Sequence, residues 1–261
     1  MAGTITGVSE PLHVYRYGPD APTQVLAIHG LTGHGQRWET LATRHLAEFA
    51  VAAPDLLGHG RSTWAAPWTI DANAAAVAAL LDAPAVVVGH SFGGAVALAL
   101  AASRPDLVSA LVLLDPAVGL DGEWMRDIAD SMMASPDYTD RAEARAEKAY
   151  GSWADVDGDE LDRELDEHLV DQENGRVGWR ISIPAMMSYW SELARPMSLP
   201  PSMIPTTLIR ASRTSPPYVT DELLTELAAD RDFTLMDFDC DHMVAQALPV
   251  ETAAVIRKAL G

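Results

Sequence analysis

A serine flanked by glycines occupies residues 89–93, which read Gly-His-Ser-Phe-Gly and match the pattern G-x-S-x-G. An apolar run at residues 85–88 precedes this segment, and a helical pattern at 92–103 follows it. A sharp turn from strand to helix strains the serine backbone and exposes its hydroxyl, while glycines on both sides let neighbouring chain approach. The N-terminus of the following helix favours a developing negative charge. This context predicts that Ser91 is a nucleophile.

A second glycine-dense segment, residues 29–35, follows the apolar run at 24–28. The backbone N–H of Leu31 is placed there to donate to the same oxygen as the N–H of Phe92, directly after the serine. These two groups would form an oxyanion hole, and a loop whose glycines only permit a tight turn is the alternative. We expect structural roles for His29 and His90, because each lies inside a turn motif.

A candidate base follows the last expected strand. His242 lies in residues 239–243, between the apolar run at 234–238 and a final helical pattern at 249–260. A neutral imidazole at this place could accept the Ser91 proton and later return it to the leaving group. His168, by contrast, lies in a charged segment, and we expect it to be solvated.

These motifs resemble the α/β-hydrolase superfamily over the whole core of the chain, and residues 54–62 resemble a structural loop of that family. The resemblance implies a serine esterase or lipase-like protein with a helical cap inserted after the sixth strand. It also implies the chain order nucleophile, acid, histidine, which His242 fits. Epoxide hydrolases and haloalkane dehalogenases of similar fold use an aspartate nucleophile, so Ser91 argues against both.

The acid departs from the commonest pattern of the family, because Thr214 occupies the usual position after the seventh strand. The other known position is the end of the sixth strand, where Asp115 begins an Asp-Pro-Ala segment similar to that of pancreatic-type lipases. Asp115 is therefore the predicted acid, and a helix-capping aspartate is the alternative. Asp239 ranks second, and Asp241 and Asp221 are further competitors.

Short apolar runs alternate with helical patterns along the chain, which predicts an α/β fold with a mostly parallel sheet flanked by helices. The expected strands are residues 12–17, 24–28, 51–54, 85–88, 110–114, 207–211 and 234–238, and the clearest helices are 37–48, 73–81, 92–103, 221–229 and 249–260. Most of the strands are continuous apolar runs, as expected where a strand is buried on both faces.

Between Pro116 and Pro205 no strand-like run appears, and we interpret this interval as a helical cap. The expected division is a first core part at residues 1–116, the cap at 117–204 and a second core part at 205–261. Most aromatic and Met side chains of the cap would pack on the core, but some would line a pocket for a small or medium hydrophobic group. The candidates are Trp38, Met125, Met186, Tyr189 and Trp190.

Composition limits the partners of this 261-residue chain. With 37 acidic against 18 basic residues, its net charge of -19 would repel nucleic acid and anionic membranes. The first thirty residues lack the pattern of a secretion signal, and the single cysteine, Cys240, excludes an internal disulfide, so we expect a cytoplasmic protein. No metal or cofactor motif is present, and we expect no cofactor. The oligomeric state stays open.

The sequence thus predicts a serine hydrolase that cleaves a carboxylic ester, with lactone or thioester as neighbouring substrates. Two alternatives stay open. One is another reaction with the same triad, such as carbon–carbon bond hydrolysis or cofactor-free perhydrolysis. The other is a ligand-binding protein on a hydrolase scaffold that has lost turnover.

Overall fold

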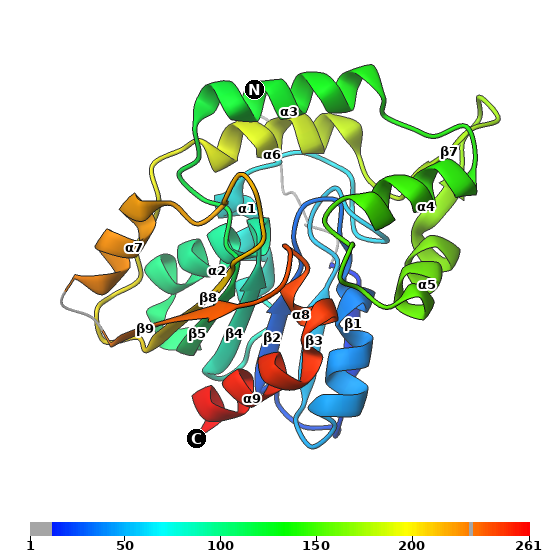
Figure 1. Cartoon of the computed structure of the whole chain (residues 1–261). Helices are drawn as coiled ribbons and strands as arrows, with labels where there is room; N and C mark the ends of the chain where they lie inside the picture. Colours follow the sequence, from blue (N-terminus) through cyan, green and yellow to red (C-terminus); the bar gives the residue numbers. More distant parts are fainter. Residues whose placement is uncertain (1–11, 230–231) are drawn as a thin grey trace, which may run out of the picture.

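A seven-stranded sheet forms the centre of the computed structural model, which describes residues 12–229 and 232–261 (Figure 1). The strands lie in the order β1-β3-β2-β4-β5-β8-β9, and only the edge strand β1 is antiparallel to its neighbour. Their bounds are β1 Val14–Tyr17, β2 Val25–Ile28, β3 Val51–Pro54, β4 Ala85–His90, β5 Val108–Leu114, β8 Thr206–Ala211 and β9 Phe233–Phe238. All seven expected strands are present, and the mostly parallel sheet is confirmed.

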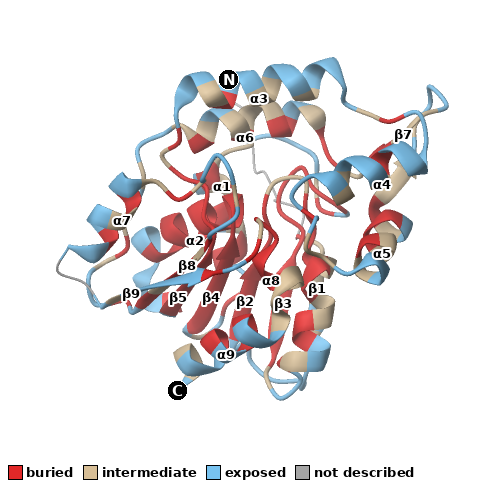
Figure 2. Ribbon diagram, viewed as in Figure 1, coloured by how far each residue is buried: buried red, intermediate tan, exposed pale blue. Residues whose placement is uncertain are grey.

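Apolar packing on both faces explains why the central strands carry continuous apolar runs (Figure 2). In β2, Leu26 and Ile28 join one hydrophobic cluster, whereas Val25 and Ala27 join the cluster on the opposite face. Alternate side chains of a strand point to opposite faces, so a strand covered on both sides needs apolar residues at every position.

Helices cover both faces of the sheet. One cluster includes α1 (Ile70–Ala78), α2 (Phe92–Ser103) and α7 (Asp221–Ala228), and the other includes α9 (Pro249–Leu260) and the four-residue α8 (Val244–Ala247). The bounds of α2 and α9 agree with the sequence prediction. Within the described residues, no helix combines the length and the apolar character that a membrane crossing needs.

The expected helix at residues 37–48 is formed in part, as an irregular helical segment over residues 35–45, and the prediction of a regular helix was wrong. The segment begins with a 3₁₀ turn, η1 (Gly35–Trp38), and ends with a π-helical turn, η2 (Leu41–His45). Trp38 and Leu41 still pack against the sheet, which explains the helix-like apolar spacing. Tertiary contacts override the regular geometry, because the Gly35 N–H donates to the Asp55 carboxylate at 2.7 Å.

The segment between β5 and β8 lies over one end of the sheet (Figure 1). It contains α3 (Gly122–Ala134), α4 (Arg141–Tyr150), α5 (Gly158–His168), β6 (Leu169–Asp171), β7 (Val177–Trp179) and α6 (Ile183–Leu193). The antiparallel pair β6 and β7 corrects the expectation of a strand-free interval. Three residues per strand are too few to show an alternating pattern in the sequence.

Side-chain caps fix where the helices of this segment begin. The carboxylate of Asp121 accepts from the Trp124 N–H before α3, and that of Asp140 accepts from the Glu143 N–H before α4. Such caps satisfy backbone donors that have no partner inside the helix. Short polar residues between the apolar stretches therefore determine the register of the helices that face the site.

Candidate active site

Ser91 lies at the turn between β4 and α2, with a φ of 54° and a ψ of -121°. Its backbone is held on both sides: the Ser91 N–H donates to Leu114 O at 3.0 Å, and its carbonyl accepts from Gly94 and Ala117. A left-handed φ is costly for a residue with a side chain, so it persists only where its surroundings enforce it. The turn therefore has the strained geometry that the sequence indicated.

The two glycines around Ser91 let the chain pack closely at this turn. A Cβ on Gly89 would lie 2.4 Å from Gly93 O, and a Cβ on Gly93 would lie 2.4 Å from Ile28 O. Both neighbours are backbone atoms that cannot rotate away. The glycines thus allow β2, β4 and α2 to meet beneath the serine.

Asp115 and His242 form a direct contact, with His242 Nδ1 2.6 Å from Asp115 Oδ2. The Asp115 side chain is 1% exposed, and its other oxygen accepts from the Ala211 N–H at 3.1 Å. A buried carboxylate at Nδ1 orients the imidazole and stabilises its protonated form, leaving Nε2 for proton transfer. The predicted acid is therefore placed to act on the predicted base.

Thr214, which occupies the usual acid position of the family, is also part of this arrangement. Its hydroxyl donates to Asp115 Oδ2 at 3.3 Å and lies 3.4 Å from Asp241 Oδ1. The Thr214 hydroxyl thus forms a hydrogen bond to Asp115, the predicted acid. The sequence analysis missed this role of Thr214.

The competing carboxylates have other contacts. The Asp239 side chain is 91% exposed and pairs with Arg213. Asp241 accepts from the backbone N–H of His242, and Asp221 is exposed at the start of α7. Within the described residues, none of the three forms a hydrogen bond or ion pair with the His242 ring.

Two neighbouring histidines are structural, as expected. His90 Nε2 donates to His242 O at 2.8 Å, and His29 Nε2 accepts from the Leu56 N–H at 2.9 Å. Burial holds the pKa of both rings well below the usual range. Both stay neutral, so each can use its hydrogen bonds to fix the loops around Ser91.

The loop that carries His242 is also tied to the segment above the sheet. Asp155 accepts from the Asp241 N–H at 2.6 Å and pairs with Arg213 at 3.1 Å. The His242 ring is close to the rings of His90 and Tyr218, at centroid distances of 4.6 and 4.4 Å. Contacts on several sides therefore define the position of the imidazole.

Leu31 and Phe92, the predicted oxyanion-hole donors, lie on two segments that meet near Ser91. A Cβ on Gly30 would lie 2.9 Å from Ser91 Cβ, so the loop that carries Leu31 touches the serine directly. Phe92 is the first residue of α2. Among the described residues, neither backbone N–H has a hydrogen-bond acceptor. Both are therefore available to a substrate oxygen.

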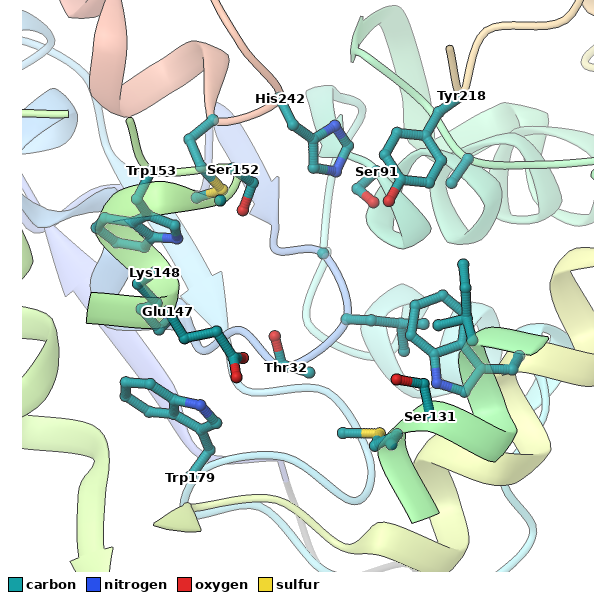
Figure 3. A pocket seen from close by; sticks show the side chains of 18 of the residues that line it. Thr32, Ser91, Ser131, Glu147, Lys148, Ser152, Trp153, Trp179, Tyr218 and His242 are labelled. Carbon is teal, nitrogen blue, oxygen red and sulfur yellow. The ribbon is translucent and has the colours of Figure 1, made fainter. Parts of the chain in front are cut away.

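A cavity of about 680 Å³ opens beside Ser91 and His242 (Figure 3). Its apolar lining includes Leu31, Trp124, Ile128, Met132, Trp190 and Leu193, and its polar lining includes Thr32, Ser131, Ser152, Glu147 and Lys148. The volume is in the range of small-molecule sites. Ser91 and His242 therefore face a space that can hold a substrate of moderate size.

Of the five expected substrate-binding residues, the structure places Trp190 in the lining of this cavity. The other four do not line it, which corrects the prediction. Trp38 packs under the opposite face of the sheet, and Met125 and Met186 are buried in the core. Tyr189 is buried too, with its hydroxyl donating to Leu57 O at 2.9 Å. The apolar character of these four side chains predicts that they are buried. It does not predict whether they face the core or the cavity.

Four lining residues that the sequence analysis did not assign to the site lie across the pocket from Ser91, namely Glu147, Lys148, Trp153 and Trp179 (Figure 3). Lys148 Nζ lies 4.6 Å from the centre of the Trp153 ring and 4.1 Å from that of Trp179. Burial lowers the Lys148 pKa to about 8. A lysine inside a charged helical pattern gives no sequence signal that it points inward.

His168 corrects a second expectation. It is buried rather than solvated, stacks on His34 and has its pKa lowered to about 2 by burial. Within residues 12–229 and 232–261, no group of three His, Cys, Asp or Glu side chains is arranged to hold a metal ion.

Residues 25–255, which include Ser91, Asp115 and His242, match the Alpha/beta hydrolase family. The chain belongs to this family. Among curated alpha/beta hydrolases it is 66% identical to Lipase LipV of Mycobacterium tuberculosis over 96% of this chain and 98% of the relative. It is also 46% identical to a pimeloyl-[acyl-carrier protein] methyl ester esterase of Neisseria meningitidis, over 36% of this chain and 37% of that one.

Solved structures confirm the alpha/beta hydrolase fold. E-2-(Acetamidomethylene)succinate hydrolase superposes with a TM-score of 0.80 at 22% identity, covering 95% of this chain and 94% of the other. A marine microorganism esterase superposes with a TM-score of 0.74 at 21% identity, covering 96% and 98%. At these identities the similarity concerns the fold.

Proposed function

We propose that this alpha/beta hydrolase is a serine hydrolase that cleaves a carboxylic ester through an acyl-enzyme. The contact of 2.6 Å between Asp115 and His242, at the pocket that Ser91 also lines, carries the proposal. The 66% identity to Lipase LipV over almost the whole chain supports ester hydrolysis. The family alone would not, because one fold hosts many reactions.

In the proposed reaction, His242 Nε2 takes the Ser91 hydroxyl proton while Ser91 Oγ attacks the ester carbonyl. The resulting oxyanion accepts hydrogen bonds from the Leu31 and Phe92 amides. His242 then gives its proton to the departing alcohol as the carbon–oxygen bond breaks, which leaves Ser91 acylated. Water, deprotonated by the same imidazole, attacks the acyl-enzyme, and Ser91 recovers its proton as the acid leaves.

The proposed substrate is an ester with a small or medium hydrophobic group. Trp124, Trp190 and Leu193, which are among the apolar residues lining the cavity, support this proposal. We predict from composition that the protein binds neither nucleic acid nor membranes. The cytoplasmic location also stays a prediction from the sequence.

We propose the domain division that the sequence suggested: a core at residues 1–116 and 205–261, and a cap at 117–204. The described helices α3 to α6 above the sheet support it (Figure 1). Residues 1–11 of the first core part and 230–231 of the second lie outside the described residues.

Labelling with a fluorophosphonate tests the reactive serine. We expect rapid labelling of the wild-type protein and none of Ser91→Ala, because only an activated serine hydroxyl attacks the phosphorus quickly. A protein that resists labelling would support the ligand-binding alternative.

A panel of p-nitrophenyl esters and lactones tests the reaction. We expect turnover of the esters by wild type and loss of turnover in Ser91→Ala. Rapid labelling without ester or lactone hydrolysis would contradict the proposed reaction and favour carbon–carbon bond hydrolysis or perhydrolysis with the same triad.

A further inference from the structure

A buried group of charged and imidazole side chains joins the segment above the sheet to the loop that carries Leu31. We call it the Glu164 cluster; it consists of His34, Arg37, Lys148, Glu164 and His168. His34 and Arg37 follow β2, whereas the other three come from α4 and α5. The cluster therefore connects two parts of the chain that lie more than one hundred residues apart in sequence.

Glu164 is the centre of this cluster. Its Oε1 lies 2.5 Å from Arg37 Nη2 and 2.9 Å from Lys148 Nζ, and its Oε2 lies 2.7 Å from His34 Nε2. Arg37 Nε also donates to both carboxylate oxygens at 3.1 Å. The Glu164 carboxylate thus contacts both cationic side chains of the cluster, Arg37 and Lys148.

Burial makes this arrangement costly. The Glu164 side chain is 2% exposed, that of Arg37 is 5% exposed and that of Lys148 is 10% exposed. Desolvation of buried ions cancels much of their attraction, and well-packed apolar residues often stabilise a protein as well as a buried ion pair does. Stability alone is therefore a weak reason for such a cluster, whereas fixing a particular geometry is a stronger one.

Arg37 connects Glu164 to the loop beside Ser91. Its Nη2 donates to Thr32 O at 3.0 Å, and Thr32 has a left-handed φ of 58°. The Gly33 N–H closes the same turn on Gly30 O at 3.1 Å, with Leu31 between them. The guanidinium thus holds the turn that presents the Leu31 amide.

We propose that Glu164 is a positioning residue that sets the oxyanion hole from the cap, by fixing the Arg37 guanidinium against the Thr32 carbonyl. The inference rests on the proposed function, because an oxyanion hole has meaning only for attack by Ser91. Without Glu164, Arg37 keeps its contact with the Trp153 ring, 5.3 Å away, but loses its carboxylate partner, and the turn carrying Leu31 loses a restraint. Catalysis depends strongly on such preorganised donors.

The ionised form of Glu164 suits this role. Burial acts to raise its pKa, but Arg37, Lys148 and His34 together hold the pKa well below the usual range. Burial lowers the His34 pKa, so that ring is neutral and donates from Nε2. Glutamine in place of Glu164 would keep the size of the side chain but would offer only one acceptor oxygen.

The test compares Glu164→Gln with wild type, using Glu160→Gln as the matched control. Glu160 lies on the same helix and contacts the core at Thr40, but it has no contact with the loop at residues 30–33. We expect Glu164→Gln to lower kcat by about tenfold or more with KM changed less than twofold, because removal of one oxyanion donor costs about 10²–10³ in kcat. Glu160→Gln should match wild type in both constants.

Two ketone inhibitors separate positioning from folding. An alkyl trifluoromethyl ketone adds to the serine and places an oxyanion in the hole, whereas the corresponding methyl ketone binds mainly without that adduct. For Glu164→Gln we expect the affinity for the trifluoromethyl ketone to fall in parallel with kcat, and that for the methyl ketone to stay within twofold. Glu164→Asp keeps the charge on a shorter side chain and should show the same selective loss at about threefold.

Thermal unfolding of each variant completes the test. A lower unfolding temperature with an unchanged ratio of the two ketone affinities, in either Glu164 variant, gives Glu164 a purely structural role and overturns the inference. An active wild type with unchanged kcat in Glu164→Gln also overturns it and leaves the proposed function intact. A wild type that neither hydrolyses esters nor binds the trifluoromethyl ketone contradicts the proposed function, and the inference with it.

Discussion

At the scale of single residues, unusual backbone conformations gather around the proposed site. Among the described residues, three that are not glycine have a positive φ: Thr32, Ser91 and Asp115. Each has a different place in the proposed mechanism: Thr32 lies in the oxyanion loop, Ser91 is the nucleophile and Asp115 is the acid. Strained backbone persists where the surrounding structure enforces it, and it often clusters at functional sites.

Replacement of Asp115 by Asn tests the acid. The amide would keep the shape but could not stabilise a protonated His242, so we expect kcat to fall by about three orders of magnitude or more. Stopped assays with a p-nitrophenyl ester and a circular dichroism spectrum would measure activity and folding. Asp239→Asn is the control and should stay within twofold of wild type, because that side chain is 91% exposed. The reverse result would assign the acid to Asp239.

The sequence was sufficient to predict that Ser91, Asp115 and His242 follow three strands of the sheet, Ser91 and Asp115 directly and His242 after three intervening residues. The carboxyl ends of parallel strands share one edge of a sheet, so residues at those ends meet. The pocket lining could not be predicted in the same way. Tyr189 and Trp190 are neighbours on α6, yet the first is buried in the core and the second lines the cavity.

At the scale of elements, close packing of strands and helix beneath Ser91 depends on Gly93. Gly93→Ala would place a methyl group 2.4 Å from Ile28 O and 2.6 Å from His29 O. We expect a loss of about 1–3 kcal/mol in the free energy of unfolding, as for other overpacked sites. Urea denaturation would measure it. Gly158→Ala is the control, because a methyl group there would meet a single atom at 3.7 Å, and it should lower the free energy of unfolding less. Gly175→Ala is unsuitable because Gly175 has a positive φ.

Uniform burial explains why some strands were predicted well, although β1 and β9 were also predicted and are not uniformly buried. Strands such as β3 (Val51–Pro54) are buried at every position, so apolar composition alone defines them. The prediction of a regular α-helix failed at residues 37–48, where an apolar spacing typical of an α-helix coincides with contacts from Gly35 to Asp55 and from Arg37 to Glu164. Contacts between residues distant in the chain are not visible in a local pattern.

Lys148 on α4 predicts a pH dependence of stability. Burial lowers its pKa from 10.5 to about 8. Below pH 8 both the folded and the unfolded chain hold this proton, whereas between about pH 8 and 10.5 the unfolded chain holds it more often. The contribution of Lys148 to stability therefore rises with pH in that range, by up to about 3 kcal/mol.

Comparison with Lys148→Met isolates this contribution, since other titrating groups are common to both proteins. The free energy of unfolding, from urea denaturation at pH 7 and pH 10, should increase for wild type relative to the variant. An equal change in both proteins would show that Lys148 keeps its ordinary pKa.

At the scale of the whole molecule, charge is distributed unevenly between surface and interior. The net charge is -19, and most ion pairs of the described residues are exposed, such as Arg104 with Asp106. Exposed ion pairs contribute little to stability. The excess negative charges repel one another in the folded state, and this repulsion destabilises it. The buried pair of Arg37 and Glu164 is screened much less by salt.

Added salt should therefore stabilise this protein. The Debye length falls from about 30 Å at 0.01 M to about 10 Å at 0.1 M ionic strength, so repulsion across the surface weakens while contacts inside the Glu164 cluster persist. We expect the unfolding temperature at pH 8 to rise by at least about 2 °C, since roughly 2–4 °C corresponds to 1 kcal/mol in a chain of this size. Thermal melts in NaCl and in KCl should give equal shifts, because screening does not depend on the identity of the cation. A flat or falling unfolding temperature would mean that the attraction within exposed ion pairs outweighs the net repulsion.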